Sequence, residues 1–542
     1  MILSSSTAAD INATVWAAAL AANVSAGLSA AIGGSFSENL IGYDVDFEEL
    51  SSSEDAAAGA YAKIESSNID AAGSLDVTAT GTQSIDSFVF SGAVAIAGGA
   101  GGGAAAGSGS EARNRINNGI QATLTDTATS DGISAATINF SATDSSTIKS
   151  DVAAATLAAS VGPAIGTIAV GVSLASNEIK TEVIASLDSP DPIETVSGAA
   201  IWSASSDSLI EATSTAATLA ATFGSFAIGG AGAEAVNYIT GSTQAGVRNA
   251  DLSIATDLSI DAENKSIIDA TITGVSAAVA VPTTGSAVAG SIGVAIARNL
   301  IGNAYDSSVN ADYESSDTPD KLEYGDKIKL SEGAYAGAIF TYKGSGEDDP
   351  DLTVQDYNNR DEWSYANLAS SPLAVTAFME DANATVGGNL SINAVADQSV
   401  ESSVLALSAA LSLGASHNSA SIAFSGAGGT AENAITTSVQ AYIIASDDTR
   451  SVSADQISIL AEDRSSIISD VGAGSIAGAT AGPLSISSAI SIGVAVANND
   501  IANVVAAYSE GTTLTARTGS LMVSASESAT LTSDVVAVSL AV

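Results

Sequence analysis

The sequence contains no cysteine, which excludes disulfides, thiolate metal sites and cysteine nucleophiles. Histidine occurs once in 542 residues, at His417, in a Ser/Asn-rich segment typical of a surface turn, and no Ser–His–Asp order accompanies it. Aromatic residues make up 5% of the chain although hydrophobic residues reach 46%, so the apolar side chains are mostly Ala, Val and Ile. Such small side chains cannot fill a wide globular interior, but they fill a thin core between two close sheets.

Basic residues are also scarce. The chain has 16 Lys+Arg against 60 Asp+Glu, a formal net charge of -44. This balance excludes nucleic-acid binding through phosphate contacts, which needs a basic surface. It attracts divalent cations, so calcium is the one cofactor to consider, with solubility in salty water as the simpler explanation of the acidity.

No membrane-spanning run is present. The nearest apolar stretch, from Ala277 to Ala297, is interrupted by Pro282 and several glycines. No basic segment followed by an apolar run comes after Met1, so we expect any export signal to lie outside these residues. The sequence therefore predicts a protein that is not inserted in a membrane.

One marker, Asn-x-Ile, recurs along the chain and reveals an internal repeat. Its asparagines are Asn39, Asn114, Asn177, Asn237, Asn299, Asn433 and Asn499. Their successive spacings are 75, 63, 60, 62, 134 and 66 residues, so the basic period is near 62. A second aliphatic marker, such as Ile148 or Ile467, lies about midway, and we interpret each repeat as two coils of about 30 residues.

Residue alternation indicates strands. The stretch Leu484–Ala497 alternates large and small residues with period two, and frequent glycine would weaken a helix by about 1 kcal/mol per position. The predicted fold class is all-β, an elongated repeat solenoid related to a β-helix. With coils about 4.8 Å apart, sixteen or seventeen of them would form a rod of about 80 Å.

The repeated asparagines have two structural interpretations. In-register coils would place them in one ladder of side-chain amides, each bonded to the asparagine above and below. If each asparagine recurred only on every second coil, it would cap a turn through its own backbone. In either case we predict no catalytic residue among them.

Both ends of the chain have the same phase within the repeat. Residues 1–22 align without gaps onto residues 521–542, and no polar cap is visible. We expect a segment of a longer array, or a protomer that stacks on itself head to tail or laterally.

Two insertions follow the Asn-x-Ile marker, and the larger one divides the chain into solenoid repeats at 1–312, a small aromatic-rich β-module at 313–372 and further repeats at 373–542. In a solenoid such insertions emerge on one edge. The aromatic residues of the module either form its own core, or Tyr335, Tyr342 and Trp363 stack on a glycan or another surface.

Two acidic groups are candidate calcium ligands. Asp44, Asp46 and Glu48 alternate along a strand-like segment of the first insertion, and Asp348, Asp349 and Asp351 lie in the second. Carboxylate oxygens are the ligands that Ca²⁺ prefers, although neither group matches an EF-hand loop.

The unit Ser291–Gly302 and its counterpart Ile490–Ile501 resemble repeats of giant secreted β-strand-repeat proteins of Gram-negative bacteria, of the adhesin or matrix type with filamentous-haemagglutinin-like arrays. The insert with Tyr324, Phe340, Tyr357 and Trp363 is similar to small modules embedded in those proteins. The resemblance implies export and an extracellular or cell-surface location. It also implies adhesive, filament or biofilm-matrix roles.

Three functions follow as hypotheses. The first is a structural rod or filament, and the second is an adhesin stalk whose module binds a glycan or a surface. The third and most remote is a polysaccharide-active β-helix enzyme, which would need convergent acids in a groove. Because the acids are scattered through the repeats, the sequence favours a protein that is not an enzyme.

Overall fold

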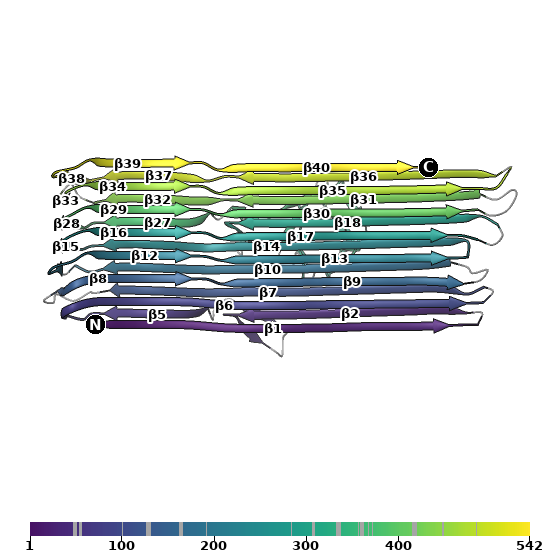
Figure 1. The fold of residues 1–542 in the computed structure, drawn as a ribbon, viewed down its shortest axis with the longest axis horizontal. Helices are drawn as coiled ribbons and strands as arrows, with labels where there is room; N and C mark the ends of the chain where they lie inside the picture. Colours follow the sequence, from purple (N-terminus) through teal and green to yellow (C-terminus); the bar gives the residue numbers. More distant parts are fainter. Residues whose placement is uncertain are drawn as a thin grey trace.

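The chain folds into two long parallel β-sheets that face each other across a thin core (Figure 1). In this computed structural model the described residues are 1–542 apart from 26, 47–50, 54–56, 100, 126–131, 162–165, 191, 283–284, 306–308, 332–337, 349, 356, 358–361, 367, 371, 415–419, 447–448 and 484. Every regular element in this described part is a strand. The all-β prediction is therefore confirmed.

The first sheet contains 19 strands. They are β1 (Ile2–Asn23), β6 (Ile69–Gly98), β8 (Ile133–Asp144), β9 (Thr147–Val161), β11 (Pro192–Thr195), β12 (Ala200–Ser206), β13 (Leu209–Thr222), β15 (Asp251–Ile254), β16 (Leu258–Asn264), β17 (Ile267–Ala280), β28 (Asn383–Val386), β29 (Leu390–Ala396), β30 (Ser399–Leu413), β33 (Arg450–Ala454), β34 (Ile457–Asp463), β35 (Ser466–Thr480), β38 (Thr512–Ala516), β39 (Leu521–Glu527) and β40 (Thr530–Ala541). Short bends divide most passes of the chain through this sheet into two or three strands.

The second sheet contains 11 strands. They are β2 (Leu28–Ile41), β5 (Ala58–Glu65), β7 (Gly103–Thr125), β10 (Gly166–Asp188), β14 (Phe226–Arg248), β18 (Ala287–Ile301), β27 (Leu373–Glu380), β31 (Ala420–Ile435), β32 (Thr437–Ile444), β36 (Ile486–Ile501) and β37 (Val504–Glu510). The chain alternates between the two sheets, and each pass pairs in parallel with the pass one repeat earlier.

The pairing register corrects the predicted coil length. Ile179 of β10 pairs with Ile239 of β14, so one repeat of about 60 residues, and not 30, brings the chain back beside itself. Each half-repeat of about 30 residues crosses one sheet in a nearly straight line and does not close a coil. The strand β6, for example, extends over 30 residues, or about 100 Å at ~3.3 Å per residue. Eight passes through the first sheet span only about 40 Å, not about 80 Å.

The space between the sheets has two parts. One holds aliphatic residues with a few aromatics, among them Phe140 stacked on Trp202 with ring centroids 5.9 Å apart. The other is lined only by alanine in its buried apolar cluster. The sheets there approach so closely that a Cβ on Gly229 would lie 2.8 Å from the Ala277 carbonyl oxygen. The sequence predicted this thin core from its small side chains.

The insertions form small separate sheets. The first contains β3 (Asp44–Asp46) paired with β4 (Ser51–Ser53). The second contains β19 (Asn303–Tyr305) with β26 (Leu368–Ser370), β21 (Lys321–Leu322) with β24 (Glu347–Asp348), and a four-stranded sheet of β20 (Tyr313–Glu314), β22 (Lys327–Lys329), β23 (Ile339–Tyr342) and β25 (Trp363–Tyr365). Because β19 precedes residue 313 and pairs with β26, the inserted strands begin before the predicted boundary.

Both insertions leave the second sheet at the same repeat position. Gly42 and Gly302 each directly follow the isoleucine of an Asn-x-Ile marker, and their φ angles are 77° and 80°. This left-handed conformation favours glycine, because a Cβ would be strained there. A Cβ at Gly42 would also lie 2.6 Å from the amide nitrogen of Ala58.

Candidate functional site

The seven marker asparagines form one continuous ladder in the second sheet. Each Nδ2 donates to the Oδ1 of the next asparagine, at distances of 2.7, 2.8, 2.8, 2.7, 2.8 and 2.7 Å from Asn39 to Asn499. All but the last are buried, and Asn114, Asn177, Asn237 and Asn299 are fully inaccessible. We call this set the asparagine ladder. The turn-capping alternative is excluded, because asparagines occur on successive passes of the second sheet.

The ladder explains how the passes keep their register. A shift of one residue would turn every asparagine from the core to the outer face, because side chains alternate along a strand. The penultimate member, Asn433, also donates to Ser402 Oγ of the first sheet at 3.1 Å, which ties the two sheets together. The asparagine ladder therefore fixes the register of neighbouring strands from inside the core.

A second set of buried polar residues lies where the inner passes through the first sheet bend, among them Asp144, Asn264 and Asp463. Asn118 Nδ2 of the second sheet donates to Asp144 Oδ1 at 2.6 Å and to Gln83 Oε1 at 2.7 Å. Three passes after Asp144, Gln398 Nε2 donates to Asn264 Oδ1 at 3.0 Å. One pass further on, Asp463 Oδ2 accepts from Asn503 Nδ2 at 2.9 Å. We call these residues the polar column.

Asp144 is the electrostatically unusual member of the polar column. Burial raises the pKa of its carboxyl, and hydrogen bonds from Ser146, Asn118 and Ser208 oppose that rise. The sequence analysis missed this column. Its signal was a polar residue two positions before Ser at several bends, as in Asp144/Ser146, Asn264/Ser266 and Asp463/Ser465.

The aromatic residues predicted as ligand contacts lie elsewhere. Trp363 is fully buried and Tyr342 is 6% exposed, with their ring centroids 5.0 Å apart. They belong to a cluster that includes Phe340 and Tyr357 of the insertion and reaches Tyr238 on the second sheet. These two rings form the core of the module, so neither offers a free face to a ligand. Tyr335 lies outside the described residues.

The acidic candidates are not brought together as a cation site in the described part of the chain. The backbones of Asp44 and Asp46 pair with β4, while Glu48 and Asp349 lie outside the described residues. Asp348 is exposed, and Asp351 Oδ1 accepts from Thr353 Oγ1 at 2.6 Å and from its amide at 3.0 Å. Those two bonds lower the pKa of Asp351. Within the described ranges no three His, Cys, Asp or Glu residues are grouped for metal binding.

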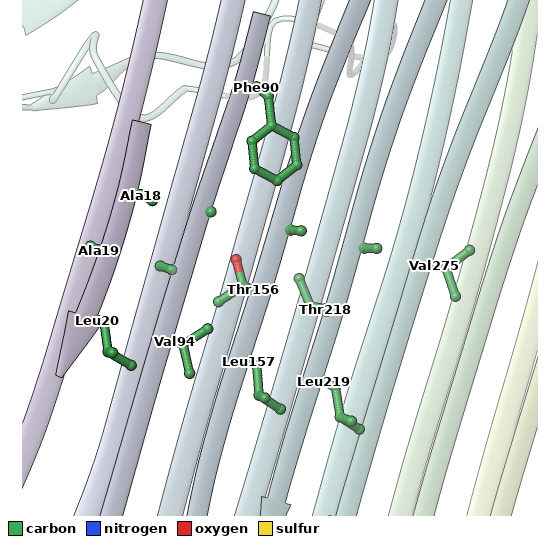
Figure 2. Close-up of a pocket in the computed structure, with 14 residues that line it drawn as sticks. Ala18, Ala19, Leu20, Phe90, Val94, Thr156, Leu157, Thr218, Leu219 and Val275 are labelled. Carbon is green, nitrogen blue, oxygen red and sulfur yellow. The ribbon is translucent and has the colours of Figure 1, made fainter. Parts of the chain in front are cut away.

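A groove of about 610 Å³ crosses the outer face of the first sheet (Figure 2). Gly92, Ala155 and Ala217 form its floor, between larger outward residues such as Phe90 and Leu219. No ionisable side chain lines it. Such a lining can contact apolar groups of a ligand or another protein, but it supplies no acid or base for catalysis.

Two further observations bear on function. In the part of the chain that the structure describes, no helix has the length and apolar character needed to cross a membrane. Comparisons with protein-family models, curated proteins and solved structures found no match to this chain.

Proposed function

We propose that this chain is a β-solenoid segment of an extracellular structural protein, a stiff array of a bacterial surface or matrix. The asparagine ladder is the observation that carries the proposal. It runs through all seven passes of the second sheet and places a hydrogen-bonded amide at the same point of each repeat. Its members contact one another inside the core, where they stabilise the array and meet no outside ligand.

The pattern of interactions supports a mechanical role. Each pass is joined to its neighbour by long parallel runs of main-chain hydrogen bonds, such as the 23 residue pairs between β10 and β14. A cross-strand array of this kind is stiff along the strands and along the stack, because both directions depend on many bonds in parallel. The resemblance to secreted bacterial repeat proteins supports the cell-surface location.

Three measurements test this proposal. Far-ultraviolet circular dichroism should show strand signal with little helix, and fibre or powder diffraction of aligned protein should give a ~4.8 Å reflection along the stack. Antibodies against the chain should label intact cells of the source organism. Labelling only after lysis would contradict the extracellular role, and a helical spectrum would contradict the solenoid.

The inserted module favours a second candidate function, an adhesin stalk. Its four-stranded sheet has a core of its own and leaves Tyr324 76% exposed, in a turn with Gly325 at φ 99°. An exposed ring can stack on a sugar. A glycan array probed with the full chain and with Tyr324→Ser tests this function. Equal signals from both proteins would exclude Tyr324 as the contact.

A further inference from the structure

The outer face of the second sheet is apolar over about a third of its width, the first four outward positions of passes that are 23 residues long in β10 and β14. We define the apolar face by the outward residues at four successive positions of this sheet. They are Leu28, Ala30, Ile32 and Gly34; Gly103, Ala105, Gly107 and Gly109; Gly166, Ile168, Val170 and Val172; Phe226, Ile228, Gly230 and Gly232; Val288, Gly290, Ile292 and Val294; Ile422, Phe424, Gly426 and Gly428; and Ser488, Ile490, Ile492 and Val494. Its large residues are open to solvent: Ile32 is 84% exposed, Ile292 60% and Ile492 59%.

At two of these four positions, large side chains and glycines alternate from one strand to the next. Across the seven strands one row reads Ile32, Gly107, Val170, Gly230, Ile292, Gly426, Ile492. The neighbouring row repeats the alternation from Gly109 to Val494. The face is therefore corrugated at these two positions, with aliphatic ridges about 9.6 Å apart, two strand spacings, and glycine grooves between them. At the other two positions large residues lie on neighbouring strands, as Ile168 and Ile228 do.

The groove glycines are not required by the fold of one chain. A Cβ added to Gly107, Gly230 or Gly426 meets nothing within 4 Å, and none of these residues has a positive φ. The same holds for Gly109, Gly232 and Gly428. Glycine within a strand costs stability and contributes no packing. Their benefit must come from something that fills the grooves.

The charge distribution indicates what can approach. The chain has a net charge of -44, yet the apolar face contains no ionisable residue. Glu111 and Glu234 lie one outward position beyond it. Two copies of an acidic chain repel each other over most of their surfaces. The apolar face is where they can meet without that cost.

The area is also sufficient. Seven strands at ~4.8 Å and four outward positions at ~6.7 Å cover roughly 900 Å² before corrugation is counted. A stable interface buries about 800 Å² on each partner. An apolar surface of this extent on one molecule commonly marks an interaction site.

We propose that the apolar face docks against the same face of a second copy of this chain. The Ile and Val ridges of each copy enter the glycine grooves of the other, with the two stacks offset by one strand, about 4.8 Å. Two sheets packed in this way lie about 10 Å apart, as in steric zippers. The inference deepens the proposed structural role by making single arrays pair laterally into thicker ones.

Filling the grooves tests the pairing. The triple variant Gly107→Val, Gly230→Val, Gly426→Val should fold with unchanged or raised thermal stability, because valine favours strands and the space is open. Its self-association, measured by sedimentation velocity, should be at least about tenfold weaker than that of the natural chain. Gly73→Val is the matched control, since Gly73 is also open but lies in β6 of the first sheet. Ile292→Ser, which removes a ridge, should weaken association without unfolding.

The outcomes separate this proposal from the proposed function. A β-rich natural chain that stays monomeric, or that associates equally well with filled grooves, overturns lateral pairing and leaves the solenoid intact. Flotation of the monomeric natural chain with lipid vesicles, kept in the triple variant but weakened in Ile292→Ser, would assign the face to a membrane surface and also overturn pairing between copies. Loss of strand signal in the natural chain would instead refute the solenoid itself.

Discussion

Asn177 donates its side-chain amide to Asn237 Oδ1 at 2.8 Å, although 60 residues separate the two in the sequence. The residues are direct partners in the parallel pair β10–β14, and both side chains are fully buried. The amide of Asn177 thus satisfies a neighbour on each side, since it also accepts from Asn114. Any change at this point leaves two buried groups without a partner.

Replacing Asn177 with alanine should therefore destabilise the protein more than replacing a ladder end. We expect a loss of about 2 kcal/mol, because a buried donor and a buried acceptor both lose their bonds. Asn499→Ala, at the half-buried end, should cost less than half as much. Urea unfolding midpoints of the two variants provide the measurement. Ser176→Ala, the outward neighbour of Asn177, is the control, and an equal shift for all three would rule out a cooperative ladder.

Asp144→Asn should stabilise the protein at neutral pH. Burial raises the pKa of this carboxyl above its usual 3.8, so ionising it in the folded state is unfavourable. As pH rises from 3.8 through the raised folded-state pKa, the folded protein holds more protons than the unfolded chain, and stability falls. An amide avoids this loss, and Asn264 already occupies the same position two passes further on.

The pH profile separates this explanation from a simple packing change. We expect the variant to be more stable than the natural protein at pH 7, measured by urea unfolding, and the gain to shrink toward zero below pH 3.8. A gain that is constant with pH would show that the charge of Asp144 is not its cause.

Two adjacent glycines should differ sharply in how much stability the same substitution costs. Gly229 faces the first sheet, and its Cβ would lie 2.8 Å from the Ala277 carbonyl oxygen, whereas Gly230 faces open space. Gly229→Val should cost about 2 kcal/mol or more through overpacking, and Gly230→Val should lie within about 0.5 kcal/mol of the natural protein. Thermal unfolding of both variants at low protein concentration makes the comparison. If Gly229→Val cost as little stability as Gly230→Val, the two sheets would have to lie further apart at Gly229 than they do in the structure.

The main sheets should fold without the inserted module. Tyr305 and Leu368 are opposite partners in the β19–β26 pair, so an Asn-Gly turn in place of residues 306–367 can join them as a hairpin. The shortened protein should keep its strand spectrum. It should lose modest stability, because Val236 and Leu300 become uncovered. Leu300→Thr in the shortened protein is the control for solubility, and a loss of all cooperative unfolding would make the module essential to folding.

The sequence predicted the strands, the thin core and the ladder positions for a clear reason: each leaves a local signal. Alternation of side chains identifies a strand, and the regular return of Asn39, Asn114 and Asn177 identifies residues that occupy one position in the repeat. The length of one circuit was predicted wrongly, because polar bends such as Ser145–Ser146 resemble turns while the chain continues in the same sheet. Only the pairing register distinguishes a bend from a turn.

The candidate site residues were harder to predict. The aromatic-rich composition around Trp363 and Tyr342 is the same whether these rings face solvent or a core. Their burial depends on how the module packs against Tyr238. The burial of Asp144 likewise depends on Asn118, which lies in the other sheet. Contacts between sheets leave no period in the sequence, so the Asp144/Ser146 spacing marks a bend but does not show that Asp144 is buried.

Asn299 and Asn433 are bonded at 2.8 Å although they are 134 positions apart in the sequence, more than twice the usual interval. The strand pairing of the second sheet continues without interruption on both sides of the inserted module, because the chain leaves the sheet at Gly302 and resumes pairing with β14 in β27. A module can therefore be inserted or replaced at this junction during evolution without changing the pairing of the two main sheets. An engineer can use the same junction to display a foreign domain at one chosen height along the stack.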